Sequence, residues 1–311
     1  MGRQPAPHFF GEDIMSSHLK LAAGIATAGR RALLIETLRE LSRQTRLPDC
    51  VIICPAADGD CDKSAADSLP FPLILARGRR GLPAQRNAIL DAAQAFDILV
   101  FFDDDFFAAP NYFAELESCF CDDPAIVAMS GKLIADGVTG PGMDADRARA
   151  ILASSKVPPQ TDFITDVYNA YGCNMAVRLA PIRDQGLRFD ESLPLYGWLE
   201  DVDFSRQLAA YGRIVKNQRM AGVHLGVKGG RVSGVKFGYS QIANPIYLWR
   251  KGTLRLDRAV RQMSRNLLAN SAKIFWPEPW TDRRGRLLGN LLGFLDLLRG
   301  YLHPARILEL D

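Results

Sequence analysis

A short apolar run that meets three consecutive acids constrains this 311-residue chain more than any other feature. Residues 99–102 read Leu-Val-Phe-Phe, and Asp103, Asp104 and Asp105 follow them directly. Branched and aromatic residues in such a run predict a buried strand. A buried strand does not tolerate adjacent unpaired charges, so the strand must end where the acids begin, and the acids must face solvent or a cation.

The spacing of these acids favours a metal site. Asp103 and Asp105 are two residues apart, so they would point the same way in an extended segment. Two carboxylates on one side supply the hard oxygen ligands that Mg²⁺ or Mn²⁺ prefers. Open α/β sheets also bind their ligands where strands end. A solvated acidic turn is the alternative interpretation of so short a pattern.

The preceding residues predict an α/β fold with a parallel sheet. Apolar runs typical of strands alternate there with helical periodicity, which is the pattern of right-handed crossovers. We expect strands at residues 18–27, 50–54 and 71–76 before the acid-tipped strand, and helices at residues 31–43 and 83–94. No Gly-x-Gly-x-x-Gly or Walker loop follows a predicted strand, which disfavours dinucleotide dehydrogenases and P-loop kinases. Residues 136–162 are rich in Gly, Pro and Asp and predict a long loop over a site.

The loops that follow the predicted strands carry both acids and arginines. The carboxyl ends of parallel strands meet at one edge of a sheet, so these loops would lie together. Acids there can bind ribose hydroxyls or a metal, and arginines can bind phosphate with two hydrogen bonds. The edge therefore predicts a site for a nucleotide with a diphosphate.

Composition limits the class of protein. With 48% hydrophobic and 23% charged residues, the chain is an ordinary globular protein, long enough for one large domain with an appendage. The net charge of +3 is too small to indicate nucleic acid. From residue 246 onward, however, 12 Lys and Arg face 6 Asp and Glu, which suggests an anionic membrane or phosphorylated partner. Six cysteines without a Cys-x-x-Cys pair disfavour zinc and favour a reducing compartment.

Residues 1–17 are predicted to be a loose leader, because they are polar and lack the apolar core of a signal peptide. No apolar run has the length needed to cross a bilayer. We therefore expect a cytoplasmic protein that is at most peripheral on the cytoplasmic face of the membrane.

A second group of acids begins a predicted helix. Glu200, Asp201 and Asp203 stand in its first turn, where the helix dipole favours negative charge. Trp198 directly precedes them, and an aromatic ring next to an acid can form a sugar platform beside a base. A capped amphipathic helix with an exposed acidic end is the alternative.

His224 ends an apolar stretch, and a Gly-rich basic loop with Lys228 and Arg231 follows it. The imidazole is a candidate third metal ligand or a structural hydrogen-bonding group. The loop would either close over a diphosphate or remain solvated.

The C-terminal part predicts basic amphipathic helices at residues 258–275 and 287–298, with Trp276, Trp280 and Tyr301 between or after them. Such helices can lie on an anionic membrane. Packing against the sheet or against a sister subunit is the alternative.

Five stretches, in this order, resemble the family 2 glycosyltransferases, which have the GT-A fold. They are Ala-Thr-Ala-Gly-Arg at 26–30, Thr-Leu at 37–38 with Gln44, Gly-Leu-Pro-Ala-Gln-Arg-Asn at 81–87, Asp-Asp-Asp at 103–105 and Glu-Asp-Val-Asp at 200–203. The resemblance covers roughly residues 19–250. It implies a GT-A domain at residues 18–245, a Rossmann-like mixed sheet flanked by helices, followed by a basic helical extension at residues 246–311.

The resemblance also implies a reaction. A sugar would pass, with inversion, from a nucleotide-diphosphate sugar to a saccharide or lipid-linked acceptor, in exopolysaccharide or surface glycan synthesis. It implies Mn²⁺ or Mg²⁺ held by Asp105, Asp103 and His224, with Asp201 as the base and Glu200 orienting it. The donor-binding residues that it implies are Thr27, Arg30, Asp58, Arg86, Asp103, Asp104, Lys228 and Arg231. Trp198 and Asn174 are the implied acceptor-binding residues.

The chain departs from the family pattern at two places. Its first turn lacks the usual Pro, and Cys-Pro-Ala-Ala at 54–57 stands where paired acids usually end the second strand. Asp58 is then the shifted candidate for the nucleobase contact, and the base itself stays open.

Two other functions are compatible with the acids. A nucleotidyltransferase also uses sheet-edge acids and metal, but Ala-Gly-Arg-Arg at 28–31 is a poor triphosphate loop. A catalytically silent, membrane-associated protein that binds sugar nucleotides is the third possibility, and the two intact acid clusters argue against it.

Overall fold

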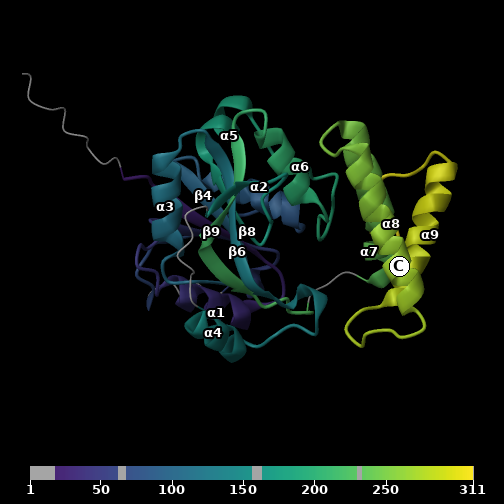
Figure 1. Cartoon of the computed structure of the whole chain (residues 1–311), viewed down its shortest axis with the longest axis horizontal. Coiled ribbons are helices and arrows are strands. Elements are labelled where there is room, and N and C mark those ends of the chain that lie inside the picture. Colours follow the sequence, from purple (N-terminus) through teal and green to yellow (C-terminus); the bar gives the residue numbers. More distant parts are fainter. Residues whose placement is uncertain (1–17, 62–67, 156–162, 230–232, 311) are drawn as a thin grey trace, which may run out of the picture.

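The computed structural model describes residues 18–61, 68–155, 163–229 and 233–310, so the predicted leader lies outside the described residues. A central sheet is flanked by helices, and a separate helical unit packs beside it (Figure 1). The strands are β1 (Leu21–Thr27), β2 (Cys50–Pro55), β3 (Leu73–Leu75), β4 (Ile98–Asp103), β5 (Phe106–Ala108), β6 (Ile126–Asp136), β7 (Ile164–Asp166), β8 (Asn174–Arg178) and β9 (Arg213–His224). The α-helices are α1 (Arg31–Leu41), α2 (Leu82–Ala92), α3 (Tyr112–Asp122), α4 (Ala145–Ser154), α5 (Leu179–Gln185), α6 (Glu200–Leu208), α7 (Gly234–Lys251), α8 (Leu256–Lys273) and α9 (Arg283–Leu298).

The sheet is mixed, with β4 near its centre. Its order is β3-β2-β1-β4-β8-β6-β9-β5, and β7 pairs with β9. The first four strands are parallel, as the alternation of the sequence predicts, whereas β8 runs antiparallel to β4. The short strand β5 returns antiparallel along β9, and its Phe106 pairs with His224. This pairing brings the end of β9 to the acids that follow β4.

Alternate residues of β4 enter the two halves of the core, as the period of a strand requires. Val100 and Phe102 pack with α1 and α3, whereas Leu99 and Phe101 pack with α2, α5 and α6. All four are buried, which confirms the buried strand predicted from this run.

The region from 136 to 155 differs from the predicted loop. It contains a short 3₁₀ turn (Gly137–Thr139) and helix α4, and the Asp144 carboxylate caps α4 by accepting a hydrogen bond from the Arg147 amide at 2.8 Å. Ala148, Ile151 and Leu152 pack on the residues of β9. Helix α4 was not predicted because it has few apolar residues and lies in a stretch rich in Gly, Pro and Asp.

Helices α7, α8 and α9 form the helical unit. Backbones of α7 and α9 approach closely, since a Cβ added at Gly238 or Gly289 would lie 2.1 Å from a carbonyl oxygen of the other helix. The predicted domain boundary between residues 245 and 246 falls inside α7, so the extension and the sheet domain share one continuous helix. Among the described residues, no helix has both the length and the apolar character needed to span a membrane.

Polar contacts fix the helical unit against α6. Buried Asp203 accepts hydrogen bonds from Lys251 Nζ at 2.8 Å and Thr253 Oγ1 at 2.6 Å. Lys251 Nζ also lies 2.6 Å from Asp190, and Asn244 donates to the Trp198 carbonyl at 2.7 Å. The third acid of the Glu-Asp-Val-Asp motif therefore holds the helical unit in place.

Candidate active site

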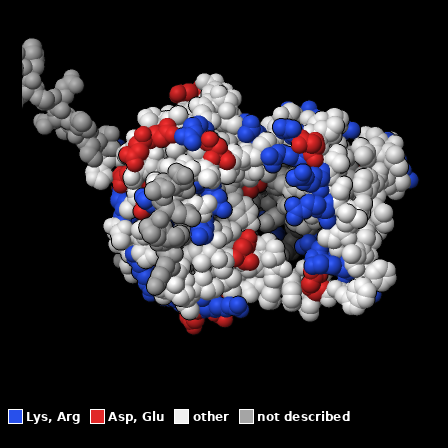
Figure 2. Space-filling view, in the orientation of Figure 1, with Lys and Arg blue, Asp and Glu red and all other residues white. Residues whose placement is uncertain are grey.

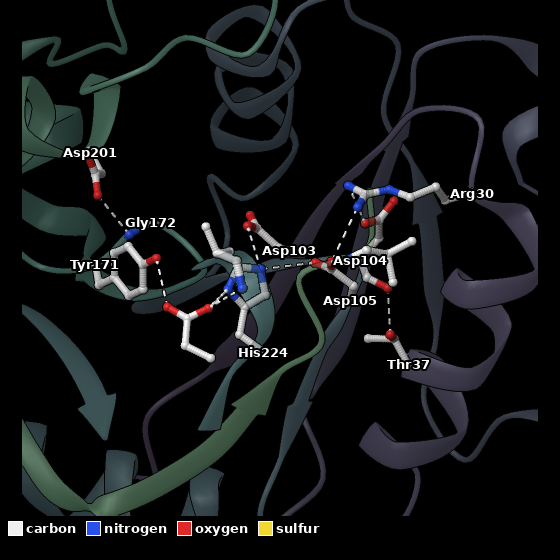
Figure 3. A network of polar contacts seen from close by, with 12 residues as sticks. Arg30, Thr37, Asp103, Asp104, Asp105, Tyr171, Gly172, Asp201 and His224 are labelled. Atoms are coloured by element: carbon white, nitrogen blue, oxygen red, sulfur yellow. Dashed lines mark hydrogen bonds and ion pairs between the residues drawn. The ribbon is translucent and has the colours of Figure 1, made fainter. Parts of the chain in front are cut away.

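The three acids after β4 point in different directions. Asp103 ends the strand and is partly exposed, whereas Asp104 and Asp105 lie in the following turn and are buried. Asp104 turns toward Arg30, and Asp103 and Asp105 approach His224 (Figure 3). The turn therefore divides one acidic run into a structural acid and two acids at a site.

Asp104 belongs to an internal network. Its carboxylate accepts a hydrogen bond from Thr27 Oγ1 at 2.6 Å and lies 2.7 Å from Arg30 Nη2, while its carbonyl accepts from Thr37 Oγ1 at 2.7 Å. Burial raises the pKa of Asp104 to about 7, although Arg30 opposes this shift. Thr27, Arg30 and Asp104, all predicted to bind the donor, thus hold one another and fix the turn.

Asp103, Asp105 and His224 form a cluster that could hold a metal ion. One ligand atom from each lies within 4.8 Å of the others. His224 Nε2 is 3.2 Å from Asp105 Oδ1 and 3.7 Å from Asp103 Oδ2. Burial would lower the pKa of His224, but the Asp105 and Asp136 carboxylates raise it well above its ordinary value. Two carboxylates and an imidazole suit Mn²⁺ or Mg²⁺ chemically, so the residues fit the predicted metal.

The other ring nitrogen of His224 faces a carboxylate that the sequence analysis missed. Asp136, the last residue of β6, lies 3.2 Å from His224 Nδ1 and accepts a hydrogen bond from the Tyr171 hydroxyl at 3.3 Å. Metal-binding histidines commonly donate this N–H to a carboxylate, which orients the ring. Asp136 was missed because residues 136–162 were predicted to be a loop, whereas β6 continues to Asp136.

Arg86 joins the two acid clusters. This fully buried guanidinium donates to Glu200 Oε1 at 2.7 Å and to the Gly172 carbonyl at 2.7 Å, and its Nη2 lies 3.3 Å from Asp103 Oδ1. Helix α2 supplies Arg86, and Gly81 and Pro83 begin that helix at the sheet edge. A cation shared between Glu200 and Asp103 keeps the start of α6 close to the end of β4.

Asp201 occupies the first turn of α6. Its Oδ2 accepts a hydrogen bond from the Gly172 amide at 3.0 Å (Figure 3). Burial raises the pKa of Asp201, and burial raises that of Glu200 to about 8 although Arg86 opposes the shift. Such shifts bring carboxylates toward the pKa range in which general bases work near neutral pH.

The chain enters α6 through a strained turn. Leu199 has a φ of 74°, which non-glycine residues rarely adopt and which costs of the order of 1 kcal/mol. Leu199 is buried against Val202 and Leu248, and this packing holds the turn. The strain lies directly between Trp198 and Glu200, so it sets the direction in which both side chains leave the backbone.

A pocket of about 370 Å³ unites these groups. Its walls include Arg86, Asp103, Tyr171, Asn169, Tyr196, Trp198, Glu200, Asp201, His224, Phe237 and Gln262. Trp198 and Tyr196 each lie 5.9 Å from the Phe237 ring, measured between ring centroids. The pocket therefore has groups that could hold a metal, two acids and an aromatic wall. The space-filling view shows a hollow between the sheet domain and the helical unit (Figure 2).

A family model described as glycosyl transferase family 2 matches residues 23–183, more than half of the chain. The chain belongs to this family. The match includes the acids after β4 and ends before the Glu-Asp-Val-Asp helix. The structure shows that Asp103 and the first two acids of this helix line the same pocket. No curated protein matches the chain.

Solved glycosyltransferases share the fold. The mannosyltransferase PcManGT from Pyrobaculum calidifontis, solved with GDP-Man and Mn²⁺, has a TM-score of 0.53 and 17% identity over 92% of this chain and 83% of that chain. GalNAc-T7, solved with UDP, GalNAc and Mn²⁺, has a TM-score of 0.53 and 14% identity over 93% of this chain and 59% of that chain. S. aureus TarS 1-349 with UDP-GlcNAc has a TM-score of 0.50 and 14% identity over 81% of this chain and 71% of that chain.

These likenesses confirm the predicted GT-A fold with a mixed sheet and a helical C-terminal region. At such identities they show the fold alone. The chain also spans less than two thirds of the length of some of these chains, 59% for GalNAc-T7 and 42% for another TarS chain.

Several residues predicted for this glycosyltransferase do not line the pocket. Asn174 is fully buried at the start of β8, so we do not expect it to touch an acceptor in this conformation. Lys228 Nζ donates to the carbonyls of Gly137 and Val138 at 3.1 and 2.8 Å. Asp58 is exposed, and it is Asp60 that accepts from the Gly29 amide at 2.8 Å. Arg231 lies outside the described residues.

Proposed function

We propose that this glycosyltransferase is metal-dependent and inverting, and that it moves a sugar from a nucleotide-diphosphate sugar to a saccharide or lipid-linked acceptor in exopolysaccharide or surface glycan synthesis. The observation that carries the proposal is that the cluster of Asp103 and His224 and the acids of α6 line one pocket. Leaving-group stabilisation and acceptor activation need these two sets of groups a short distance apart.

The donor would bind on the β4 side of the pocket. Asp103, Asp105 and His224 would hold a divalent ion, which neutralises charge on a leaving diphosphate. Arg86 adds a buried positive charge next to Asp103. Asp58, Lys228 and Arg231 stay our candidates for the outer contacts to base and diphosphate, since they follow β2 and β9 in the chain.

The acceptor would bind on the α6 side. Asp201 takes the proton of the acceptor hydroxyl, whose oxygen forms a bond to the anomeric carbon while the bond to the diphosphate oxygen breaks. The diphosphate leaves with the bonding electron pair, so a single displacement inverts the carbon. Glu200 is bound to Arg86 and orients the site, and Trp198, with Phe237 beside it, gives a flat apolar surface for a sugar ring.

The apolar surface of the helical unit supports a peripheral position on the cytoplasmic face of a membrane, where a lipid-linked acceptor would lie. Leu288, Leu291, Leu295 and Leu298 are exposed on one face of α9, and Phe275 and Trp276 are exposed beyond α8. Arg284 and Arg299 stand at the two ends of the leucine face. Exposed leucines with aromatic and basic neighbours are typical of helices that lie on anionic lipid.

Donor turnover tests the proposal. Purified protein is incubated with UDP-, GDP- and dTDP-sugars, with Mn²⁺ or with EDTA, and thermal stabilisation and released products are measured. We expect one nucleotide class to stabilise the protein by mass action and to release nucleoside diphosphate, with both effects lost in EDTA and in Asp105→Ala. Asp201→Asn should keep donor binding and lower transfer by about 10²- to 10⁴-fold.

The alternatives give other results. Release of pyrophosphate would indicate nucleotidyl transfer. Metal-dependent donor binding without turnover, in any sugar class, would indicate a silent binding protein. Asp122→Asn, an exposed acid at the end of α3, is the matched control and should leave all readouts unchanged.

A further inference from the structure

Helix α8 carries a row of arginines beside the pocket. Arg258, Arg261 and Arg265 are separated by three and four residues, so they neighbour one another along one side of the helix. We call these three residues the arginine ridge. Gln262, which lines the pocket, stands one turn from Arg258 and one turn from Arg265. The ridge therefore borders the acceptor side of the pocket.

The ridge lacks carboxylate partners within the described part of the chain. All three guanidinium groups are exposed, and none of them has a carboxylate within ion-pair distance there. Some arginines of the sheet domain are paired instead: Arg149 pairs with Glu36 and Glu40, and Arg213 pairs with Asp123 and Asp166. Figure 2 shows Lys and Arg side chains along the edge of the helical unit that faces the hollow, over α8.

One contact to the sheet domain and two contacts to α7 and α9 fix the position of α8. The Arg258 guanidinium lies 3.9 Å from the centre of the Tyr168 ring, and Arg206 of α6 lies 4.6 Å from the same ring. Buried Asn270 in the last turns of α8 donates to Gln241 at 2.8 Å and to Asn290 at 2.9 Å. Because both ends of α8 are held, the part of the helix that carries Arg261 and Arg265 stays beside Gln262 of the pocket.

We infer that the acceptor carries a phosphate or diphosphate group, which the arginine ridge binds while the accepting hydroxyl lies at Asp201. Arginine recognises phosphate with paired, charge-assisted hydrogen bonds, and unpaired arginines beside a pocket have no carboxylate to compete with the ligand. The inference rests on the proposed function, and it names the chemistry of the acceptor. The phosphate would come from a lipid carrier or from a phosphorylated glycan.

Binding of small charged probes tests the inference. The donor site is first saturated with UDP or GDP and Mg²⁺, so that the probe cannot occupy it. Titration calorimetry then compares hexyl diphosphate with uncharged hexyl glucoside, and glucose 6-phosphate with glucose. We expect the charged member of at least one pair to bind about tenfold more tightly, with the preference reduced at high salt. Preference for hexyl diphosphate indicates a lipid carrier, and preference for glucose 6-phosphate indicates a phosphorylated glycan.

Two double variants with the same change in charge locate the effect. Arg261→Glu with Arg265→Glu should abolish the charged preference, whereas Lys20→Glu with Arg147→Glu, on the sheet domain and outside the pocket, should keep it. Equal binding of charged and uncharged probes, no binding of the charged probes to the wild type, or equal losses in both double variants would overturn the inference. Thermal stabilisation by the donor is measured on the same proteins and tests the proposed function separately. If the proposed donor site is wrong, the wild type and every variant should lack this stabilisation.

Discussion

At the scale of single residues, the acids after β4 show how neighbours in sequence take different roles. Asp103 and Asp105 reach His224, while Asp104 points back toward Thr27 and Arg30. A pattern of three identical letters does not reveal this division, because it depends on the turn that follows the strand. Burial of Asp104 beside a single arginine makes the turn sensitive to pH.

Removing Arg30 should destabilise the protein in a pH-dependent way. The folded-state pKa of Asp104, about 7, exceeds its ordinary value of 3.8, so its favourable contribution to folding is lost as the pH rises through about 7. Arg30 offsets that loss by pairing with the ionised acid, and its other contact, from Nη1 to Asp105 Oδ2 at 3.3 Å, adds a contribution that does not follow the titration of Asp104. Arg30→Gln should therefore cost about 3 kcal/mol near about pH 8 and clearly less near about pH 5.5, measured by urea unfolding. Equal costs at both pH values would contradict this role for Asp104.

At the scale of elements, the sequence predicted the parallel half of the sheet well. Apolar runs identified β1, β2 and β4, and α6 begins at Glu200 as its acids predicted. The first-turn acids, however, did not reveal that Asp203 is buried against Lys251 and Thr253. The partners lie about fifty residues away, and no local pattern encodes such a contact.

The same reason explains the other misses. Asp136 reaches His224 only because β6 and β9 run side by side, with Asp136 paired to His224 in the register. The resemblance implied Asn174 as an acceptor-binding residue, but pairing of β8 with β4 buries it. Helix α4 was missed because an Asp cap and a few apolar residues stand within a stretch rich in Gly and Pro. Local patterns thus predicted elements, whereas the site depends on pairing across the sheet.

Asp203→Ala should loosen the attachment of α7. The substitution removes the carboxylate that joins Lys251 and Thr253 to α6, while Lys251 keeps its contact with Asp190, and we expect a loss of about 3 kcal/mol in the free energy of unfolding. Hydrogen exchange should also rise in the last turn of α7. Asp166→Ala removes an acid from an exposed pair with Arg213, so as a control it should cost below about 1 kcal/mol. Similar losses in the two variants would show that Asp203 is not an anchor.

At the scale of the whole molecule, the helical unit has two surfaces, one toward the sheet domain and one toward solvent. One surface adds Phe237 and Gln262 to the pocket, and the other exposes the leucines of α9. If α9 lies on a membrane as proposed, the same helical unit contacts the bilayer and lines the pocket. A lipid-linked acceptor would then approach along α8.

Vesicle binding should depend on the leucine face of α9. Leu291→Ser with Leu298→Ser removes two exposed apolar side chains, and we expect at least about tenfold weaker co-sedimentation with vesicles that contain anionic lipid. Ile74→Ser with Tyr211→Ser changes two exposed apolar residues of the sheet domain and should have little effect. The leucine face would instead be a subunit interface if the wild type is a dimer, the leucine variant is a monomer, and neither protein binds vesicles.

The continuity of α7 has a consequence for exchanging parts between relatives. Its first turn carries Phe237 of the pocket, its middle carries Asn244 bound to the Trp198 carbonyl, and its end carries Lys251 bound to Asp203. A chimaera joined near residue 246 would take half of this helix from each parent and combine contacts that were never matched. A graft that keeps the helix whole, joined before Ser233, should transfer acceptor preference together with the arginines of α8. If the acceptor binds as proposed, acceptor choice would be inherited as a block with the C-terminal helices, rather than residue by residue.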